Sequence, residues 1–225
     1  MKKETLVISL GGSIVVPEAI DTHFLQEFKR TIIQHLNTYN FIIVVGGGKP
    51  CRTYQHAARD LEIKSNDDLD MIGIRITHAN GELIRPLFGE HAYPNLITNP
   101  SKKITTKKPI LVAAGWKPGF TTDHDSVYLA RMYSATTIIN MSNISYLYTK
   151  DPKKYPDAQK LTSTSWSALK KIVGTERTPG MNTPFDPVAT DLGSKSNLKL
   201  ILIGNNIENL KHLLEKKPFE GTTIN

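Results

Sequence analysis

Short apolar runs rich in β-branched residues recur along the chain, separated by stretches with the spacing of amphipathic helices. The run at 41–45 is apolar at every position, which is typical of a strand covered on both faces. Runs of this kind predict strands at 6–10, 41–45, 110–114, 137–141 and 199–203.

Between these runs, apolar residues recur at the i, i+4 spacing of one buried helix face. The clearest set can be capped by Asp21 or Thr22 and comprises Phe24, Leu25, Phe28, Ile32, Ile33 and Leu36. Further helices are expected at about 52–61 and at 207–214. Another is expected after Thr121, Thr122 and Asp123, whose side chains are good N-cap groups, and we expect Asp123 to cap it.

The alternation of strands and helices predicts an α/β fold, a three-layer α/β/α sandwich around a mostly parallel central sheet. Ligands of such sheets bind beyond the carboxyl ends of the strands. Four loops are expected at those ends and therefore in one site: 11–12, 46–48, 115–123 and 142–143. The stretches 149–165 and 181–187 are predicted connections, and the whole chain, 1–225, is expected to form one domain.

Two of these loops are glycine turns that each close an apolar run: Gly11-Gly12-Ser13 and Gly46-Gly47-Gly48. Glycine lets backbone N–H groups approach an anion closely, and a helix N-terminus just beyond adds a favourable dipole. The turns therefore indicate phosphate binding. Neither Gly-x-x-x-x-Gly-Lys-Ser/Thr nor Gly-x-Gly-x-x-Gly occurs, so a standard P-loop and a dinucleotide fingerprint are excluded. The alternative is two tight turns that need glycine only for backbone geometry.

Composition is that of a soluble globular protein, with 225 residues of which 39% are hydrophobic and 22% charged. A net charge of +7 suits an anionic ligand such as a nucleotide, although the basic residues are spread along the chain. Because no basic stripe carries interleaved aromatic residues, nucleic-acid binding is disfavoured.

The one cysteine, Cys51, cannot form an intrachain disulfide, and we interpret it as a small residue at a helix start. No cysteine or histidine cluster has metal-ligand spacing, so no protein metal site is expected. The first apolar run is too short for a signal peptide, and no run is long enough to span a bilayer. We therefore expect a cytoplasmic protein without a membrane partner.

Several motifs occur together in unbroken order over nearly the whole chain, and together they resemble the amino acid kinase superfamily, in particular its archaeal-type uridylate (UMP) kinases. The motifs are Gly11-Gly12-Ser13, Val44-Val45-Gly46-Gly47-Gly48-Lys49, Ile72-Gly73-Ile74-Arg75-Ile76-Thr77 with Ala79-Asn80, Pro118-Gly119 with Thr121-Thr122-Asp123, Tyr148-Thr149-Lys150-Asp151-Pro152, Phe185-Asp186-Pro187 and Gly221-Thr222-Thr223-Ile224.

The resemblance implies transfer of the γ-phosphate of ATP to UMP, with Mg²⁺, by an acceptor half at about 1–140 and an ATP-binding half at about 141–225. It also implies a homo-oligomer, a hexamer. The residues that the resemblance assigns to ATP are Gly11, Gly12, Gly48 and Arg52 on its phosphates and Ser142, Tyr148 and Asp151 on its nucleoside. The residues that it assigns to UMP are Gly47 on the phosphate, Asp70 on the ribose, and Trp116, Lys117, Pro118, Gly119, Phe120, Thr121 and Thr122 around uracil and phosphate. The candidate catalytic residues are Arg52, Lys49 and Asp123.

Two positions depart from the family pattern. Ser9 and Leu10 stand where many members have a lysine, so Lys49 and Arg52 are the nearest candidates for that charge. Ser145-Tyr146 stands in place of an Asp-Gly turn, which bulks a loop near the donor nucleoside. For Asp70, a solvated helix residue is the alternative interpretation.

Two other functions are alternatives on the same fold. Isopentenyl phosphate kinases carry a histidine in the helix after the glycine run, and here His56 lies too far along to match it. A non-catalytic nucleotide-binding or sensing module needs only one of the two ligand loops, whereas this chain has both.

Overall fold

The computed structural model describes residues 3–152, 154–176, 178 and 183–225. Its main sheet has seven strands in the order β3-β2-β1-β4-β8-β9-β7. They are β1 (Glu4–Leu10), β2 (Tyr39–Val45), β3 (Ile110–Ala113), β4 (Thr137–Met141), β7 (Ser163–Thr164), β8 (Lys199–Ile203) and β9 (Thr222–Ile224). Neighbouring strands are parallel except β8 and β9. The mostly parallel sheet is therefore confirmed.

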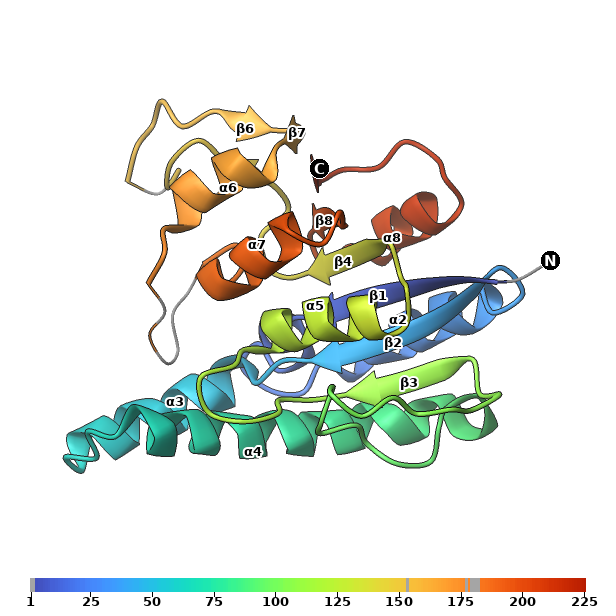
Figure 1. Cartoon of the computed structure of the whole chain (residues 1–225), viewed down its shortest axis with the longest axis horizontal. Helices are drawn as coiled ribbons and strands as arrows, with labels where there is room; N and C mark the ends of the chain where they lie inside the picture. The colour runs from blue at the N-terminus through green and yellow to red at the C-terminus, as the bar shows by residue number, and fades with distance from the viewer. Residues whose placement is uncertain (1–2, 153, 177, 179–182) are drawn as a thin grey trace.

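Helices cover both faces of this sheet (Figure 1). They are α1 (Gly12–Val15), α2 (Thr22–Gln34), α3 (Gly48–Asp60), α4 (Asn66–Ile84), the 3-10 helix η1 (Arg85–His91), α5 (Thr122–Met132), α6 (Trp166–Val173), α7 (Pro187–Ser194) and α8 (Ile207–Leu214). Side chains alternate along a strand, so Leu6, Ile8 and Leu10 pack with α2 and α8. Val7 points the other way and packs with α5, α6 and α7. The three-layer sandwich is confirmed.

Helix α2 forms where its apolar spacing predicts it. The carboxylate of Asp21 caps it by accepting a hydrogen bond from the Phe24 N–H at 2.9 Å. Phe24 and Phe28 are buried and stack with ring centroids 6.0 Å apart. One of the two cap candidates is thus the observed cap.

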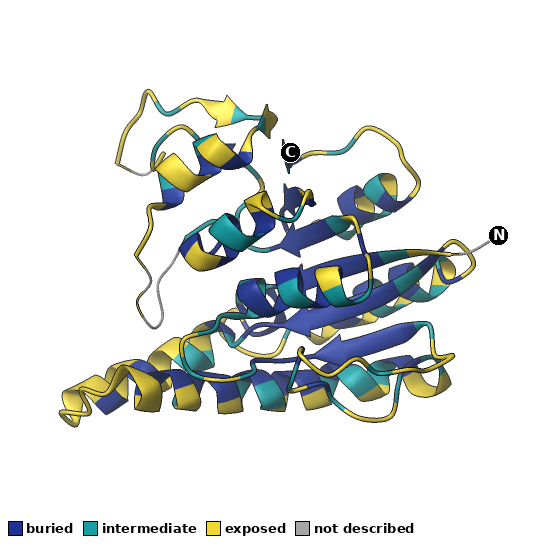
Figure 2. Ribbon diagram, in the orientation of Figure 1, coloured by how far each residue is buried: buried dark blue, intermediate teal, exposed yellow. Residues whose placement is uncertain are grey.

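The longest helix, α4, is not among the predicted elements. Its buried face carries two glycines and several polar residues beside the apolar ones: Leu69, Asp70, Gly73, Ile74, Thr77, Asn80, Gly81 and Ile84. The hydrophobic period is therefore masked. Helices α3 and α4 form a hairpin whose far end is largely exposed (Figure 2).

The stretch 149–165 was predicted to be a connection without strands, and this prediction is wrong because the stretch contains two short strands. Strand β5 (Leu147–Tyr148) pairs antiparallel with β6 (Lys160–Leu161), and β7 joins the edge of the main sheet. These strands have two residues each, too few to produce a period in the sequence. The predicted connection at 181–187 lies partly outside the described residues, and Pro187 at its end begins α7.

No helix in the described ranges combines the length and the hydropathy that crossing a bilayer requires.

Candidate active site

The carboxyl ends of β2, β1 and β4 are joined by hydrogen bonds from the two glycine turns. The Gly11 N–H donates to the Met141 carbonyl at 2.8 Å, and the Gly46 N–H donates to the Leu10 carbonyl at 2.9 Å. The turns are thereby fixed to the sheet and to each other.

Glycine is required where the two turns meet. A Cβ on Gly12 would lie 2.0 Å from the Gly48 nitrogen, and Gly48 itself has φ +70°. Any side chain at Gly12 would clash with this nitrogen, and the left-handed backbone at Gly48 favours glycine there. Helix α3 begins at Gly48, so its N-terminus, with the positive end of the helix dipole, faces the first turn.

Asn80 on α4 orients the second glycine turn. Its Nδ2 donates to the carbonyls of Gly46 at 2.8 Å and Gly47 at 3.2 Å. Because the side chain is buried, these bonds hold the carbonyl oxygens toward α4. The carbonyls therefore do not compete with an anion at the opposite side of the turn.

Helix α4 also holds the loop at 115–121. Thr77 Oγ1 accepts the Gly115 N–H at 2.9 Å, and Asp70 Oδ2 accepts the Gly119 N–H at 2.8 Å. Asp70 is only 6% exposed, so its interpretation as a solvated helix residue is wrong.

The same loop rests on α5. Asp125 Oδ2 accepts the Trp116 N–H at 3.2 Å. The Lys117 Nζ lies 4.1 Å from the Trp116 ring centroid and 4.7 Å from that of Phe120. Thr121 caps α5 by accepting the His124 N–H at 3.3 Å. The expectation that Asp123 caps this helix is wrong, because its carboxylate points to the sheet instead.

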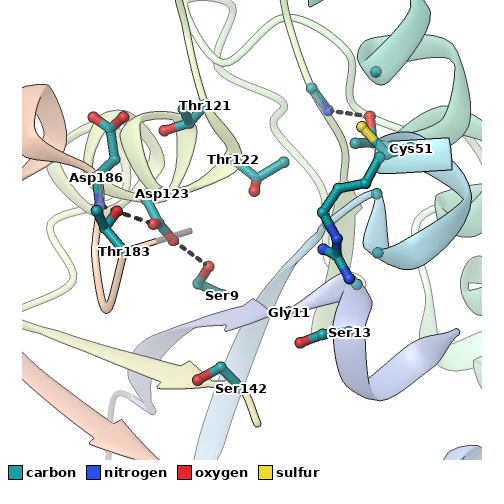
Figure 3. Close-up of a pocket in the computed structure, with 18 of the residues that line it drawn as sticks. Ser9, Gly11, Ser13, Cys51, Thr121, Thr122, Asp123, Ser142, Thr183 and Asp186 are labelled. Carbon is teal, nitrogen blue, oxygen red and sulfur yellow. Dashed lines mark hydrogen bonds between the residues drawn. The ribbon is translucent and has the colours of Figure 1, made fainter. Parts of the chain in front are cut away.

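Asp123 faces Ser9 and Asp186 (Figure 3). It accepts a hydrogen bond from Ser9 Oγ at 2.9 Å and another from the Asp186 N–H at 3.1 Å. Burial, and next the charge of Asp186, raise the pKa of Asp123 from 3.8 to about 7. Ser9 thus supplies a hydrogen bond and no charge.

Asp186 was not singled out as a site residue from the sequence. Its Oδ1 caps α7 by accepting the Ala189 N–H at 2.7 Å. The signal available in the sequence was Asp186-Pro187, since an N-cap aspartate followed by proline is typical of a helix start.

The four loops predicted to meet at one rim line a single cavity of about 380 Å³. The predicted site residues that line it are Gly11, Gly12, Gly47, Gly48, Arg52, Asp70, Phe120, Thr121, Thr122, Asp123 and Ser142. Trp116, Lys117, Pro118 and Gly119 belong to the same loop but do not line the cavity, nor do Tyr148 and Asp151 in the part of the chain that the structure describes.

Lys49 does not reach this cavity either. Its Nζ pairs with the Glu18 carboxylate, and both line a neighbouring cleft that Arg52 also borders. Among the described lysines and arginines, Arg52 alone lines the main cavity, which is also lined by Asp70, Asp123 and Asp186.

Cys51 is half-buried between the second glycine turn and α4. A Cβ on Gly47 would lie 3.1 Å from its Sγ, and one on Gly73 would lie 3.0 Å from it. Burial raises the pKa of the Cys51 thiol, which disfavours the nucleophilic thiolate. The interpretation of Cys51 as a small packing residue agrees with this environment.

The chain matches known proteins over nearly its whole length. The model of the Amino acid kinase family matches residues 4–204. A uridylate kinase of Pyrococcus abyssi is 33% identical over 223 residues, 97% of this chain and 98% of that protein. One of Methanocorpusculum labreanum is 34% identical over 224 residues, 97% of this chain and 94% of that protein.

A solved structure agrees with these matches. The crystal structure of uridylate kinase from Archaeoglobus fulgidus superimposes with a TM-score of 0.83 at 30% identity, over 98% of this chain and 99% of that one. The sequence resemblance, the sheet order and the paired glycine turns thus have one explanation, and the chain belongs to the amino acid kinase family.

Proposed function

We propose that this protein is a UMP kinase that transfers the γ-phosphate of ATP to UMP and releases ADP and UDP. The observation that carries the proposal is the single cavity whose walls contain both glycine turns, the loop before α5 and the loop after β4. Such a cavity can hold two phosphate-bearing ligands against each other. The uridylate kinases that are 33% and 34% identical over 97% of this chain support the same activity.

In this proposal the ATP phosphates lie at the first glycine turn and Gly48, and the UMP phosphate lies at Gly47. Phosphoryl transfer needs alignment and charge neutralisation more than covalent chemistry. Arg52 lies in the second turn of α3 and lines the cavity between these turns. Its guanidinium can donate to two phosphate oxygens at once, which lysine cannot do in a fixed geometry.

The acceptor nucleoside is assigned to α4 and the loop at 115–121, and the donor nucleoside to Ser142, Tyr148 and Asp151. Ser142 lines the cavity. The acceptor half at 1–140 and the donor half at 141–225 remain part of this proposal.

The residues present fit a Mg²⁺ ion that arrives with ATP. Mg²⁺ is usually bound by one or two carboxylates together with substrate phosphates. Asp123 and Asp186 line the cavity, and burial together with the charge of Asp186 raises the pKa of Asp123. These two residues would hold the ion, which neutralises phosphate charge when bound.

A coupled assay of ADP release tests the function. With ATP and Mg²⁺ we expect turnover of UMP at a higher kcat/KM than CMP and isopentenyl phosphate. Faster turnover of isopentenyl phosphate would overturn the assignment, and binding of UMP or ATP without turnover would favour a sensing module. His56, the nearest histidine to the position typical of isopentenyl phosphate kinases, is exposed and does not line the cavity.

We also propose that the protein acts as a cytoplasmic homo-oligomer, a hexamer. Light scattering on the purified protein measures the molecular mass, and a monomer at micromolar concentration would contradict this part of the proposal.

A further inference from the structure

Gln55 on α3 is a buried polar residue whose side-chain NH₂ group has a hydrogen-bond partner, whereas its oxygen has none among the described residues. Its side chain lines the cavity and the residue is 3% exposed. The Nε2 donates to the Leu69 carbonyl at 2.9 Å. The Oε1 is buried and has no hydrogen-bond partner among the described residues.

The orientation of this amide follows from its one hydrogen bond. The Leu69 carbonyl can only accept, so the NH₂ group must face it and Oε1 must face the other way. Gly73 packs directly against the amide, because a Cβ there would lie 3.0 Å from Gln55 Nε2. The side chain is therefore held in place, with an acceptor left to be satisfied.

Leaving a buried acceptor unpaired is costly, so a group bound in the cavity is expected to donate to it. On UMP the ionised phosphate only accepts, whereas the two ribose hydroxyls and the uracil N3–H can donate. Gln55 is bonded to the residue directly before Asp70, and Gln55 and Asp70 both line the cavity. Two neighbouring acceptors match the two O–H groups of a vicinal diol.

We propose that Gln55 Oε1 accepts a hydrogen bond from a ribose hydroxyl of UMP, beside Asp70, and selects ribonucleotides over deoxyribonucleotides. This inference rests on the proposed function. It assigns to a side chain of α3 a role in choosing the sugar of the acceptor.

The test is a comparison of UMP, 2′-deoxy-UMP and 3′-deoxy-UMP with the wild type and Gln55→Met, which has a similar volume without the acceptor oxygen. We expect the wild type to prefer UMP over at least one deoxynucleotide, and Gln55→Met to lower that ratio of kcat/KM about tenfold. The change should lie in the KM for UMP, since the ribose contact exists before and during transfer. The KM for ATP should stay the same.

Gln26→Met, an exposed glutamine on α2, is the matched control and should keep the wild-type ratios. Should the melting temperature of Gln55→Met show that it does not fold, Gln55→Asn replaces it, because the shorter side chain displaces the acceptor oxygen. A ratio unchanged in the folded variant overturns the proposal, and so does a wild type that uses both deoxynucleotides as well as UMP. A wild type that phosphorylates no uridine nucleotide would instead refute the proposed function.

Discussion

Asp125 should make the stability of this protein strongly dependent on pH. The side chain is fully buried under the Trp116 loop, and Oδ1 has no hydrogen-bond partner among the described residues. Burial, more than the nearby charge of Asp123, raises the pKa of Asp125 from 3.8 to about 8, against a lowering by the Trp116 hydrogen bond. At neutral pH the folded protein therefore holds a proton that the unfolded chain has lost.

The sign and size of the effect follow from that difference. Since the folded state binds the extra proton, the free energy of unfolding falls as the pH rises from the unfolded to the folded pKa. The loss is about 1.4 kcal/mol per pH unit, or about 2 kcal/mol between pH 6 and pH 8 after partial titration near pH 8. Asp123, with its pKa of about 7, adds about 1 kcal/mol over the same interval.

Asp125→Asn removes the proton and keeps an acceptor for the Trp116 N–H. For a chain of this length, about 2 kcal/mol corresponds to about 4 to 8 °C in melting temperature. We expect the fall in melting temperature from pH 6 to pH 8 to be smaller by this amount in Asp125→Asn than in the wild type. Calorimetry in EDTA without nucleotide measures it.

The exposed Asp60 at the end of α3 provides the control variant, Asp60→Asn, which should follow the wild-type curve. An Asp125→Asn protein whose melting temperature falls as steeply as that of the wild type would refute the reasoning. Asp125 would then carry its charge in the folded state throughout this interval.

Four further variants test the site and its glycine positions. Arg52→Ala should lower kcat/KM for UMP by about a hundredfold or more with little change in melting temperature, because it removes a phosphate-binding cation; unchanged kinetics would remove Arg52 from the mechanism. Asp70→Asn should raise the KM for UMP and leave that for ATP nearly the same, and a loss of ATP affinity instead would contradict the assignment. Gly12→Ala should prevent folding or abolish turnover, since its Cβ would meet the Gly48 nitrogen at 2.0 Å, whereas Gly119→Ala, where only the positive φ is strained, should cost about 1 kcal/mol. Expression yield, melting temperature and the coupled assay distinguish these outcomes, and an active Gly12→Ala would contradict the close approach of the turns.

The elements that could be predicted from the sequence are those whose own residues carry the signal. Strands β4 and β8 and helix α8 have the predicted bounds, because each is an apolar run or an amphipathic turn flanked by polar residues. The meeting of four loops at one rim also follows from local features, since the carboxyl ends of parallel strands share an edge.

Helix α4 could not be predicted from hydrophobic periodicity, because polar residues occupy its buried face. Asp70, Thr77 and Asn80 occupy its buried face and bind the backbone of the two acceptor loops. Polar groups that are buried to position other segments remove the hydrophobic period that identifies a helix. The buried polar residues that hold the two loops therefore mask α4 in the sequence pattern.

The charge of the cavity is set by residues that lie far apart in the sequence. Ser9 carries no charge, Lys49 pairs with Glu18 outside the cavity, and Asp186 lies more than 60 residues after Asp123 in the sequence. The described residues thus offer Arg52 as the one cation against several carboxylates. In the proposed reaction the two nucleotides would add further negative charge to this cavity. As part of the proposed function, a metal ion that arrives with ATP would act together with Arg52 in neutralising the phosphate charge.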